Sequence, residues 1–371
     1  MEKKAAKKNT KPVAKAKGNN KAVQTPIVEP TVTTTGAMKP VQNVQVSAWR
    51  SNKVMRLYTS IAIIFGLVLA FMLRGVSVYF FDVFLLAFLF ACVYDVMNAK
   101  QSNKANIKEY YVYVYLGIAY LVFFVGTIIA TPFSFWMHLI SQLVILFVWA
   151  IYTFFMYYVD KDVVKKCRLQ KITIGKECRR IIKGYLSIIV YPVLLLFALF
   201  AINHIDGTAE LETVNFGLFA LLLVFCISCL TDTFAYIVGS WLRGPKLLPK
   251  KMRYISEKKT ITGAIGGILG GWLGALVLLL IFSGVGAFSD FMTVKVGDAT
   301  AVLILFSVIG VVGSIVTQIG DIYASWIKRK AGIKDFGKYL PGHGGAMDRL
   351  DGISFNALFI FAVMMIIAFV C

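Results

Sequence analysis

The amino-acid sequence predicts an all-α membrane protein that crosses the bilayer about nine times. Hydrophobic residues make up 58% of the 371 residues and charged residues only 16%. The mean hydropathy is +0.73, far above that of a soluble globular protein. The apolar residues also gather in uninterrupted runs of about 20, the length that a helix needs to span a bilayer.

Nine such runs follow one another along the chain. The first two are separated by a tight turn at Arg74 and Gly75, and the first five are rich in Leu, Ile, Val and Phe, with Asp82 as their main internal charge. The last four carry carboxylates, glycines and hydroxyl groups near one end, so a functional site is expected there. The predicted spans are 57–73, 77–97, 110–130, 134–158, 184–203, 215–240, 262–288, 301–327 and 352–371.

The distribution of Lys and Arg predicts the orientation. With nine spans, 37 of the 39 basic residues fall in the N-terminal tail and in alternate loops, and the other side keeps only Arg74 and Lys295. Because cytoplasmic loops carry an excess of Lys and Arg, the N-terminus is expected in the cytoplasm. This asymmetry accounts for most of the net charge of +20, and nucleic-acid binding is not expected.

Composition divides the chain into three parts. Residues 1–48 are Lys-rich and nearly free of aromatic residues, which is typical of a disordered cytoplasmic tail. Such a tail either attracts anionic lipid headgroups or serves topology and solubility. Residues 49–210 are expected to form an N-terminal transmembrane region of about five helices, and 211–371 a C-terminal one of about four, in which the functional site is expected. The basic loop 159–183 is expected to be solvated or to face headgroups.

Carboxylates stand out in the last four spans. Asp232 and Asp321 lie within apolar helices, where an acid at the bilayer centre costs roughly 2.5–3.5 kcal/mol unless it faces a partner, cavity or cation. Asp348 and Asp351 are one helical turn apart at the start of the last span. Clustered carboxylates repel one another unless a cation lies among them, and Mg²⁺ prefers such oxygen ligands shared with a phosphate.

Complementary cations and glycines surround these acids. The stretch "ISEKKTITGAIGG" places Ser256, Lys258, Lys259 and Thr260 ahead of a glycine-rich helix start, where backbone N–H groups and lysines form an anion site. Carboxylates for a metal and cations for phosphate, at a membrane surface, point to phosphoryl or nucleotidyl transfer on a lipid. For the glycines themselves, Gly266, Gly267, Gly270 and Gly271, helix packing is the favoured interpretation. Further positive donors are Lys328, Arg329, Lys334, His343 and Arg349.

The stretch "SWIKRKAGIKDFGKYLPGHGGAMDRLD", residues 325–351, resembles the signature of phosphatidate cytidylyltransferases, or CDP-diacylglycerol synthases. "DTFAYIVG" and "SEKKTITGAIGG" resemble two further motifs of that family. The resemblance covers roughly residues 215–371. Three departures are Glu257 for a usual proline, Thr262 for a usual glutamate and Ala346 for a larger apolar residue; Thr262 matters most. The matching residues are Ser325, Lys328, Arg329, Lys334, Asp335, Gly337, Leu340, Pro341, His343, Gly344, Gly345, Asp348, Arg349, Leu350 and Asp351.

This resemblance implies the reaction CTP + phosphatidate → CDP-diacylglycerol + diphosphate. It implies that Asp321 and Asp348 hold Mg²⁺ or another divalent cation, with Asp232 and Asp351 nearby, and it allows a second, monovalent cation. The catalytic residues implied are Asp321, Asp348, Lys328, Arg329 and His343. The substrate-binding residues implied are Ser256, Lys258, Lys259, Thr260, Ser325, Lys334, Gly344, Gly345 and Arg349.

The expected partners are CTP, phosphatidate and membrane lipids, without nucleic acid, and a homodimer is allowed. The expected location is the bacterial plasma membrane, with the active site on the cytoplasmic side. Two alternatives stay open. A transporter or channel also places acids inside spans, although here the acids gather near one face. A related CTP-dependent enzyme could use another lipid acceptor, such as an ether-lipid phosphate.

Overall fold

The computed structural model describes residues 53–101, 108–129, 135–206, 209–337, 340 and 344–369. All of them belong to one compact unit, Ser47–Cys371, and the expected tail 1–48 lies outside the described residues. The predicted all-α fold is confirmed: in the described ranges, β pairing is limited to two isolated bridges, between Lys246 and Thr260 and between Leu340 and Gly344.

The predicted number of spans is confirmed as well. Within the described residues, nine helical segments are long and apolar enough to cross a membrane. They are α1 (Lys53–Arg74), α2 (Val78–Gln101), α3 (Glu109–Ile129), α4 (Phe135–Val159), the run α6 (Ile174–Ile188), η1 (Ile189–Leu194) and α7 (Leu195–Asn203), then α9 (Phe216–Leu242), α10 (Ile261–Ser283), α12 (Ala299–Lys330) and α13 (Met347–Phe369). The shorter helices are α5 (Lys161–Gln170), α8 (Ala209–Thr213), η2 (Lys250–Met252) and α11 (Gly286–Lys295).

Local chemistry explains where several of these helices begin. Thr260 precedes α10 and its Oγ1 accepts a hydrogen bond from Gly263 N at 3.1 Å. Asp298 does the same for α12, its Oδ1 accepting from Ala301 N at 3.0 Å. Both side chains satisfy backbone donors that have no partner inside the helix. The fifth span has no such boundary, because its helix already begins within the basic loop, at Ile174. Its π-helical turn η1 contains Pro192. Proline lacks the backbone N–H that a regular helix would use at this position.

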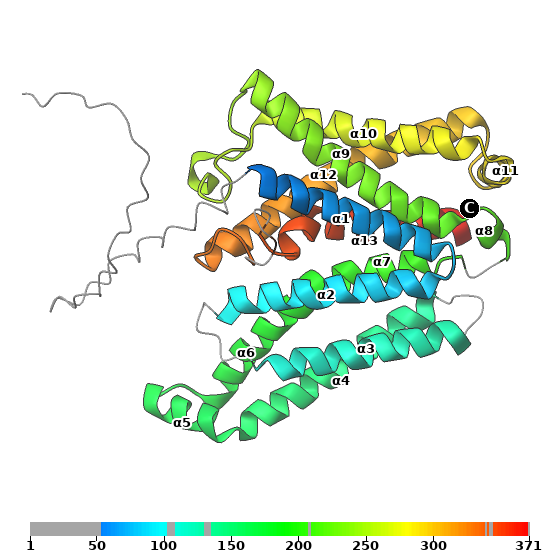
Figure 1. The fold of residues 1–371 in the computed structure, drawn as a ribbon. Coiled ribbons are helices and arrows are strands. Elements are labelled where there is room, and N and C mark those ends of the chain that lie inside the picture. The colour runs from blue at the N-terminus through cyan, green and yellow to red at the C-terminus, as the bar shows by residue number, and fades with distance from the viewer. Residues whose placement is uncertain are drawn as a thin grey trace, which may run out of the picture. The chain divides into compact units, whose positions relative to one another are not determined.

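Glycines let α10 pack closely between α9 and α12, which lie beside it in Figure 1. A Cβ at Gly271 would come within 2.5 Å of Ser314 Cβ on α12 and 2.7 Å of Thr231 Oγ1 on α9. Small residues at helix interfaces are what membrane helices use to approach one another. The structure therefore supports the packing interpretation of these glycines. The buried glycines of α10 are Gly263, Gly266, Gly267, Gly270, Gly271 and Gly274.

The last helix, α13, connects the two halves of the sequence. It packs against α9 and α12 from the second half and against α2 and α7 from the first. Figure 1 shows it in the middle of the bundle. Its first residue is Met347, five residues before the predicted start of the span, so Asp348 and Asp351 belong to its first turns. This start places both carboxylates on helical backbone.

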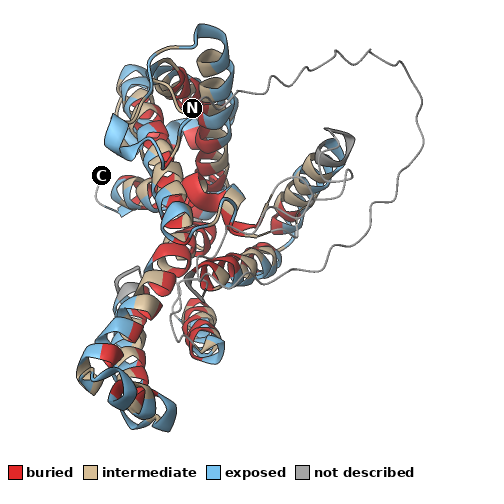
Figure 2. Cartoon of the chain, turned by 90° about the vertical axis from the view of Figure 1, so that its left-hand side faces the viewer, coloured by how far each residue is buried: buried red, intermediate tan, exposed pale blue. Residues whose placement is uncertain are grey.

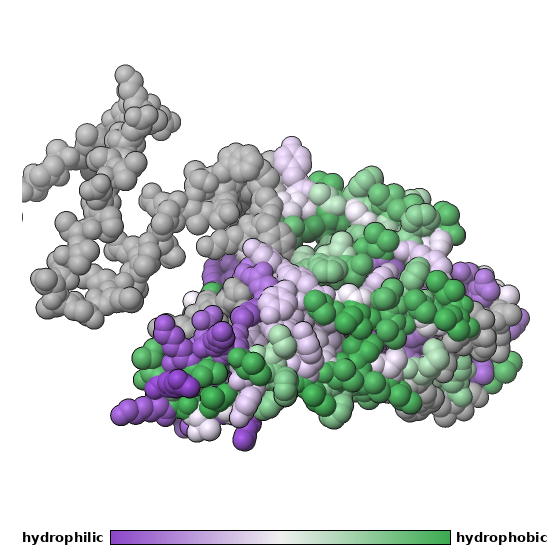
Figure 3. All heavy atoms as spheres, turned by 90° about the horizontal axis from the view of Figure 1, so that it is seen from below, coloured by the Kyte–Doolittle hydropathy of each residue, from purple (hydrophilic) through white to green (hydrophobic). Residues whose placement is uncertain are grey.

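We call the left-hand end of the bundle in Figure 1 the basic end. It holds α5, the loop after α9 with η2, and the loop between α12 and α13. Seen from this end, the helices turn their buried faces toward one another (Figure 2). Seen from below, hydrophobic side chains cover the middle of the molecule and hydrophilic ones gather toward its ends (Figure 3). This distribution is typical of a protein that spans a membrane.

A buried polar network ties α1, α2, α7 and α9 together at the opposite end. Arg74 donates to Asn203 Oδ1 at 2.7 Å and lies 2.8 Å from Asp206 Oδ2. Asp82 accepts from Asn203 at 2.9 Å and lies 2.7 Å from His204 Nε2. Burial raises the pKa of the Asp206 carboxyl, although hydrogen bonds from Gly217 N and Arg74 oppose the rise. Asp82 therefore pairs with a neighbouring helix.

Candidate active site

A cleft of about 610 Å³ opens among α9, α10, α12 and α13 near the basic end. It lies between the loop that precedes α10 and the start of α13. Nine of the predicted site residues line it: Asp232, Lys258, Lys259, Thr260, Asp321, Lys328, Asp348, Arg349 and Asp351. Segments more than 100 residues apart in the sequence thus supply both signs of charge to one space.

The polar stripe of α12 forms one wall of the cleft. Lys259 Nζ lies 2.6 Å from Asp321 Oδ2, and Gln318 Nε2 donates to Ala264 O at 3.2 Å. Both contacts hold the start of α10 against α12. The Lys259 and Asp321 side chains are 22% and 33% exposed, so this ion pair stays open to the cleft and to a ligand that enters it.

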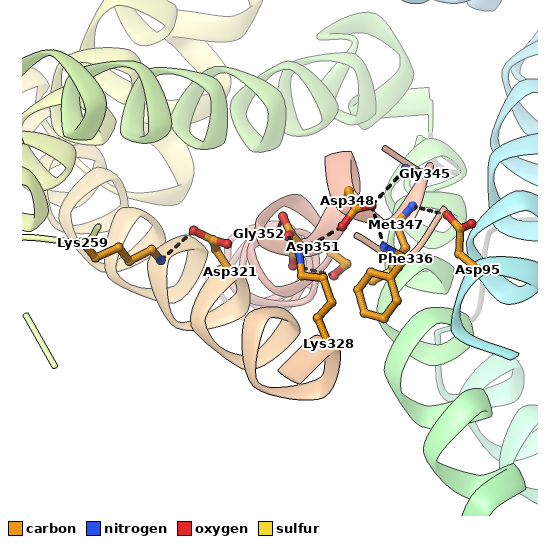
Figure 4. A network of polar contacts seen from close by, with 11 residues as sticks. Asp95, Lys259, Asp321, Lys328, Phe336, Gly345, Met347, Asp348, Asp351 and Gly352 are labelled. Atoms are coloured by element: carbon orange, nitrogen blue, oxygen red, sulfur yellow. Dashed lines mark hydrogen bonds and ion pairs between the residues drawn. The ribbon is translucent and has the colours of Figure 1, made fainter. Parts of the chain in front are cut away.

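Lys328 lies between the two carboxylates of α13 (Figure 4). Its Nζ is 2.9 Å from Asp348 Oδ1 and 3.7 Å from Asp351 Oδ2. It also lies over the Phe336 ring, 5.3 Å from the ring centroid. All three charged side chains are no more than 12% exposed. Charges this deeply buried are tolerated because they are paired.

Asp348 also holds the loop that leads into α13. Its Oδ2 accepts hydrogen bonds from Phe336 N and from Gly345 N, both at 2.9 Å. Together with Lys328, three donors surround one carboxylate. Charge-assisted hydrogen bonds of this kind are the strong ones. Asp348 therefore joins α12, the loop and α13 at one point.

Two glycines make this loop geometry feasible. Gly344 has a φ of +86°, and a Cβ there would lie 2.7 Å from Asp348 Oδ2. A Cβ at Gly345 would meet the Asp95 carboxylate and, at 2.7 Å, Gly337 N. Neither position has room for a side chain. At Gly344 the positive φ also disfavours any residue other than glycine. Because these two residues are glycines, the carboxylates of Asp348 and Asp95 can come close to the loop backbone.

The four predicted metal-binding aspartates all line the cleft. Within the described ranges, however, no group of three or more His, Cys, Asp or Glu side chains could hold a metal ion alone. Lys259 and Lys328 instead lie among the carboxylates. Mg²⁺ needs only one or two carboxylates when substrate phosphates and water complete its shell. The donor set therefore fits a Mg²⁺ shared with a phosphate ligand.

Other predicted residues lie elsewhere. Arg329 is exposed, and its Nη1 donates to Ile333 O at 3.4 Å. His343 lies outside the described residues. Ser256, Ser325, Lys334, Gly344 and Gly345 are described but are not among the cleft-lining residues, so their roles stay predictions.

Thr262 replaces the glutamate of the motif that this stretch resembles. Its Oγ1 accepts a hydrogen bond from Gly244 N at 3.2 Å, and it lies 3.2 Å from Thr260 Oγ1. Thr262 is not among the residues that line the cleft. In this chain its side chain holds the loop after α9 against the start of α10.

Two acidic residues near the site were missed from the sequence. Asp335 lines the cleft although it was expected only as a motif match. Asp95, on α2, is fully buried, and its Oδ2 accepts a hydrogen bond from Met347 N at 3.1 Å. A carboxylate near the end of an apolar span is itself a pointer to function, so the sequence did contain an indication of Asp95. Its partner 252 residues away could not be read from the sequence.

Comparison with known proteins shows which family this chain is similar to. Residues 54–367 match the cytidylyltransferase family. The chain is 38% identical over 138 residues to a phosphatidate cytidylyltransferase of Brucella abortus, covering 37% of this chain and 44% of the relative. It is 37% identical over 144 residues to one of Staphylococcus saprophyticus (39% and 48%). It is 35% identical over 153 residues to one of Rickettsia typhi (41% and 61%). The chain thus spans about half the length of these relatives.

Proposed function

The chain belongs to the cytidylyltransferase family, and from this premise we propose that it is a phosphatidate cytidylyltransferase. It would convert CTP and phosphatidate into CDP-diacylglycerol and diphosphate. The names of the relatives support this substrate pair. The nine apolar helices of the described residues support a lipid substrate, because they place the protein in a membrane.

One observation carries the proposal: a single cleft collects five carboxylates and four cationic side chains near the end of the membrane helices. The cations suit a triphosphate and a lipid phosphate, and the carboxylates suit a divalent metal. The cleft volume of about 610 Å³ is within the usual range for small-molecule sites. A site at the end of the spans would let a soluble nucleotide meet the headgroup of a lipid.

In the proposed reaction, an oxygen of the phosphatidate phosphate attacks the α-phosphorus of CTP. A new P–O bond forms, the bond from the α-phosphorus to the bridging oxygen breaks, and diphosphate leaves with that electron pair. A phosphate monoester is already anionic, so no strong base is needed. Positioning and neutralisation of charge by Lys258, Lys259, Lys328 and Arg349 would supply most of the rate.

For Mg²⁺, the proposal keeps Asp321 and Asp348 as the main ligands, with Asp232 and Asp351 nearby. When bound, Mg²⁺ would neutralise phosphate charge and help align the reacting phosphates. Asp321 would exchange Lys259 for the metal, and Asp348 would exchange one of its three present donors. Each released lysine could then contact phosphate. A second, monovalent cation near Asp232 and Asp351 remains part of the proposal.

The proposed location is a bacterial plasma membrane, with the basic end and its cleft in the cytoplasm; the N-terminus is proposed on the same side from the distribution of Lys and Arg. The relatives named above are bacterial, and the basic loops favour the cytoplasmic side. CTP is then available on the side where the cleft opens. Binding of nucleic acid is not part of the proposal, and a homodimer stays a prediction.

The test uses the purified full-length protein in detergent with radiolabelled CTP, Mg²⁺ and phosphatidate. Label should enter the organic phase only when phosphatidate is present, and EDTA should abolish its transfer. A parallel reaction with an ether-linked phosphatidate analogue tests the other acceptor class. If folded protein labels none of these lipids, the proposed function is wrong and transport becomes the hypothesis to test.

A further inference from the structure

The start of α13 is held by a carboxylate from another helix. Asp95, on α2, has an exposed fraction of 0%, and its Oδ2 accepts a hydrogen bond from Met347 N at 3.1 Å. Met347 is the first residue of α13. Figure 4 shows Asp95 reaching this amide from the side opposite to Lys328.

The sequence before α13 explains why an external acceptor is useful. The first backbone N–H groups of a helix lack intrahelical partners, and a preceding Ser, Thr, Asp or Asn usually satisfies one of them. The residues before α13 are Gly344, Gly345 and Ala346, and none carries a side-chain oxygen. Asp95 supplies this oxygen from α2, and its negative charge also suits the N-terminal end of the helix dipole.

Asp95 and Asp348 hold the same short segment from two sides. Gly345 N donates to Asp348 Oδ2 at 2.9 Å, and Met347 N, two residues later, donates to Asp95. A Cβ at Gly345 would meet the Asp95 carboxylate. The lack of a side chain at Gly345 therefore allows Asp95 to come this close.

We infer that Asp95 is a positioning residue for the cytidylyl-transfer site: by holding Met347 N, it fixes the first turn of α13 and thereby the Asp348 and Asp351 carboxylates beside Lys328. This inference rests on the proposed function for its effect on turnover. It assigns a role to the N-terminal half of the chain, none of whose described residues lines the cleft.

Asp82 offers a matched control on the same helix. It is also buried, with an exposed fraction of 1%, and it also accepts a hydrogen bond, from Asn203 Nδ2 at 2.9 Å. Its partners lie at the opposite end of α2. Loss of Asp82 should therefore lower stability without changing the start of α13.

The experiment compares Asp95→Leu, Asp95→Asn and Asp82→Leu in the full-length protein. The first readout is hydrogen–deuterium exchange in the peptide covering residues 344–352, which does not depend on activity. The second is kcat and KM for CTP, corrected for folded protein. Asp95→Leu should speed exchange in that peptide and lower kcat about 10- to 100-fold, as loss of a supporting contact does, with a smaller change in KM.

Asparagine keeps one acceptor oxygen, so Asp95→Asn should restore much of both properties. Asp82→Leu should keep wild-type exchange in residues 344–352 even if it melts earlier. If Asp95→Leu does not fold, Asp95→Ala removes the same acceptor oxygens with a smaller side chain and should speed exchange in the same way. Wild-type exchange and kcat in Asp95→Leu would overturn the inference, and so would equal loss in the Asn and Leu variants. An inactive wild-type protein would instead defeat the proposed function, while exchange would still test the contact.

Discussion

Lys328 and Arg329 are adjacent in the sequence but lie in different surroundings. Lys328 is 11% exposed and pairs with Asp348 and Asp351 inside the cleft. Arg329 is exposed and donates to Ile333 O near the end of α12. Helical geometry explains the difference, because consecutive residues are about 100° apart around a helix with 3.6 residues per turn. Two positive charges in one motif therefore need not share a task.

We expect Lys328→Met to lower turnover by about 100-fold or more, because it removes a cation from the proposed site of phosphate charge. Arg329→Met should stay within about tenfold of the unchanged protein, since an exposed charge contributes little. Initial rates of lipid labelling, with size-exclusion profiles as the folding control, measure both. Equal losses would show that Arg329 contacts substrate, as the motif resemblance implies.

At the scale of elements, α10 packs against both α9 and α12, whose residues Asp232 and Asp321 line the same cleft. A Cβ at Gly239 on α9 would lie 3.1 Å from Gly263 Cα on α10. The two backbones are therefore nearly in contact where the cleft begins. Lys259 and Thr260, directly before α10, are carried into the cleft by this close packing. A bulkier interface here would move Lys259 and Thr260 away from α9.

Gly271→Ala tests this packing, because the new Cβ would overlap Ser314 on α12. Overpacking costs about 1–3 kcal/mol, so the variant should melt at a lower temperature in detergent. Gly117→Ala, inside α3, is the matched control: a Cβ there meets nothing within 4 Å. The measurement is the melting temperature of both variants in detergent, and Gly117→Ala should keep that of the unchanged protein. An unchanged melting temperature for Gly271→Ala would contradict tight packing at this position.

At the scale of the whole molecule, α13 links the C-terminal half, which contains the cleft, to the first spans. It contacts α2 and α7 as well as α9 and α12, so two helices of the first half support the position of its aspartates. At the other end, Arg74, Asn203 and Asp206 join the turn after α1 to the region before α9. Breaking a buried ion pair of this kind typically costs about 3–5 kcal/mol. The first half therefore serves as a scaffold.

The proposed orientation predicts which residues face outward in intact cells. In a chain whose six cysteines are replaced by alanine, Asp290→Cys on α11 should react with a membrane-impermeant maleimide. Lys251→Cys in η2 should react only after the cells are permeabilised. Both residues are exposed, so access to the reagent is the only intended difference. The reverse pattern would place the cleft outside the cell.

Apolar length and charge asymmetry alone predicted the all-α fold and the number of spans, because the bilayer demands about 20 apolar residues per helix. The cost of a charge within a span singled out Asp232 and Asp321. The other expected site residues came from a pair of aspartates one helical turn apart, from lysines before a glycine-rich helix start, and from the family resemblance. The ends of the helices were less accurate. The last helix begins at Met347, five residues earlier than predicted, because an apolar run shows where a helix crosses the bilayer and not where its charged first turn begins.

Only the tertiary structure decided which of the chemically similar residues meet. It separated Lys328 from Arg329, turned Thr262 toward Gly244, and surrounded Asp348 with three donors. It also brought Asp95 from the second span to the start of the last. The physical reason is that hydrophobic periodicity places a residue in a helix, whereas hydrogen bonds between distant segments depend on how helices pack, which small residues such as Gly345 and Gly271 permit.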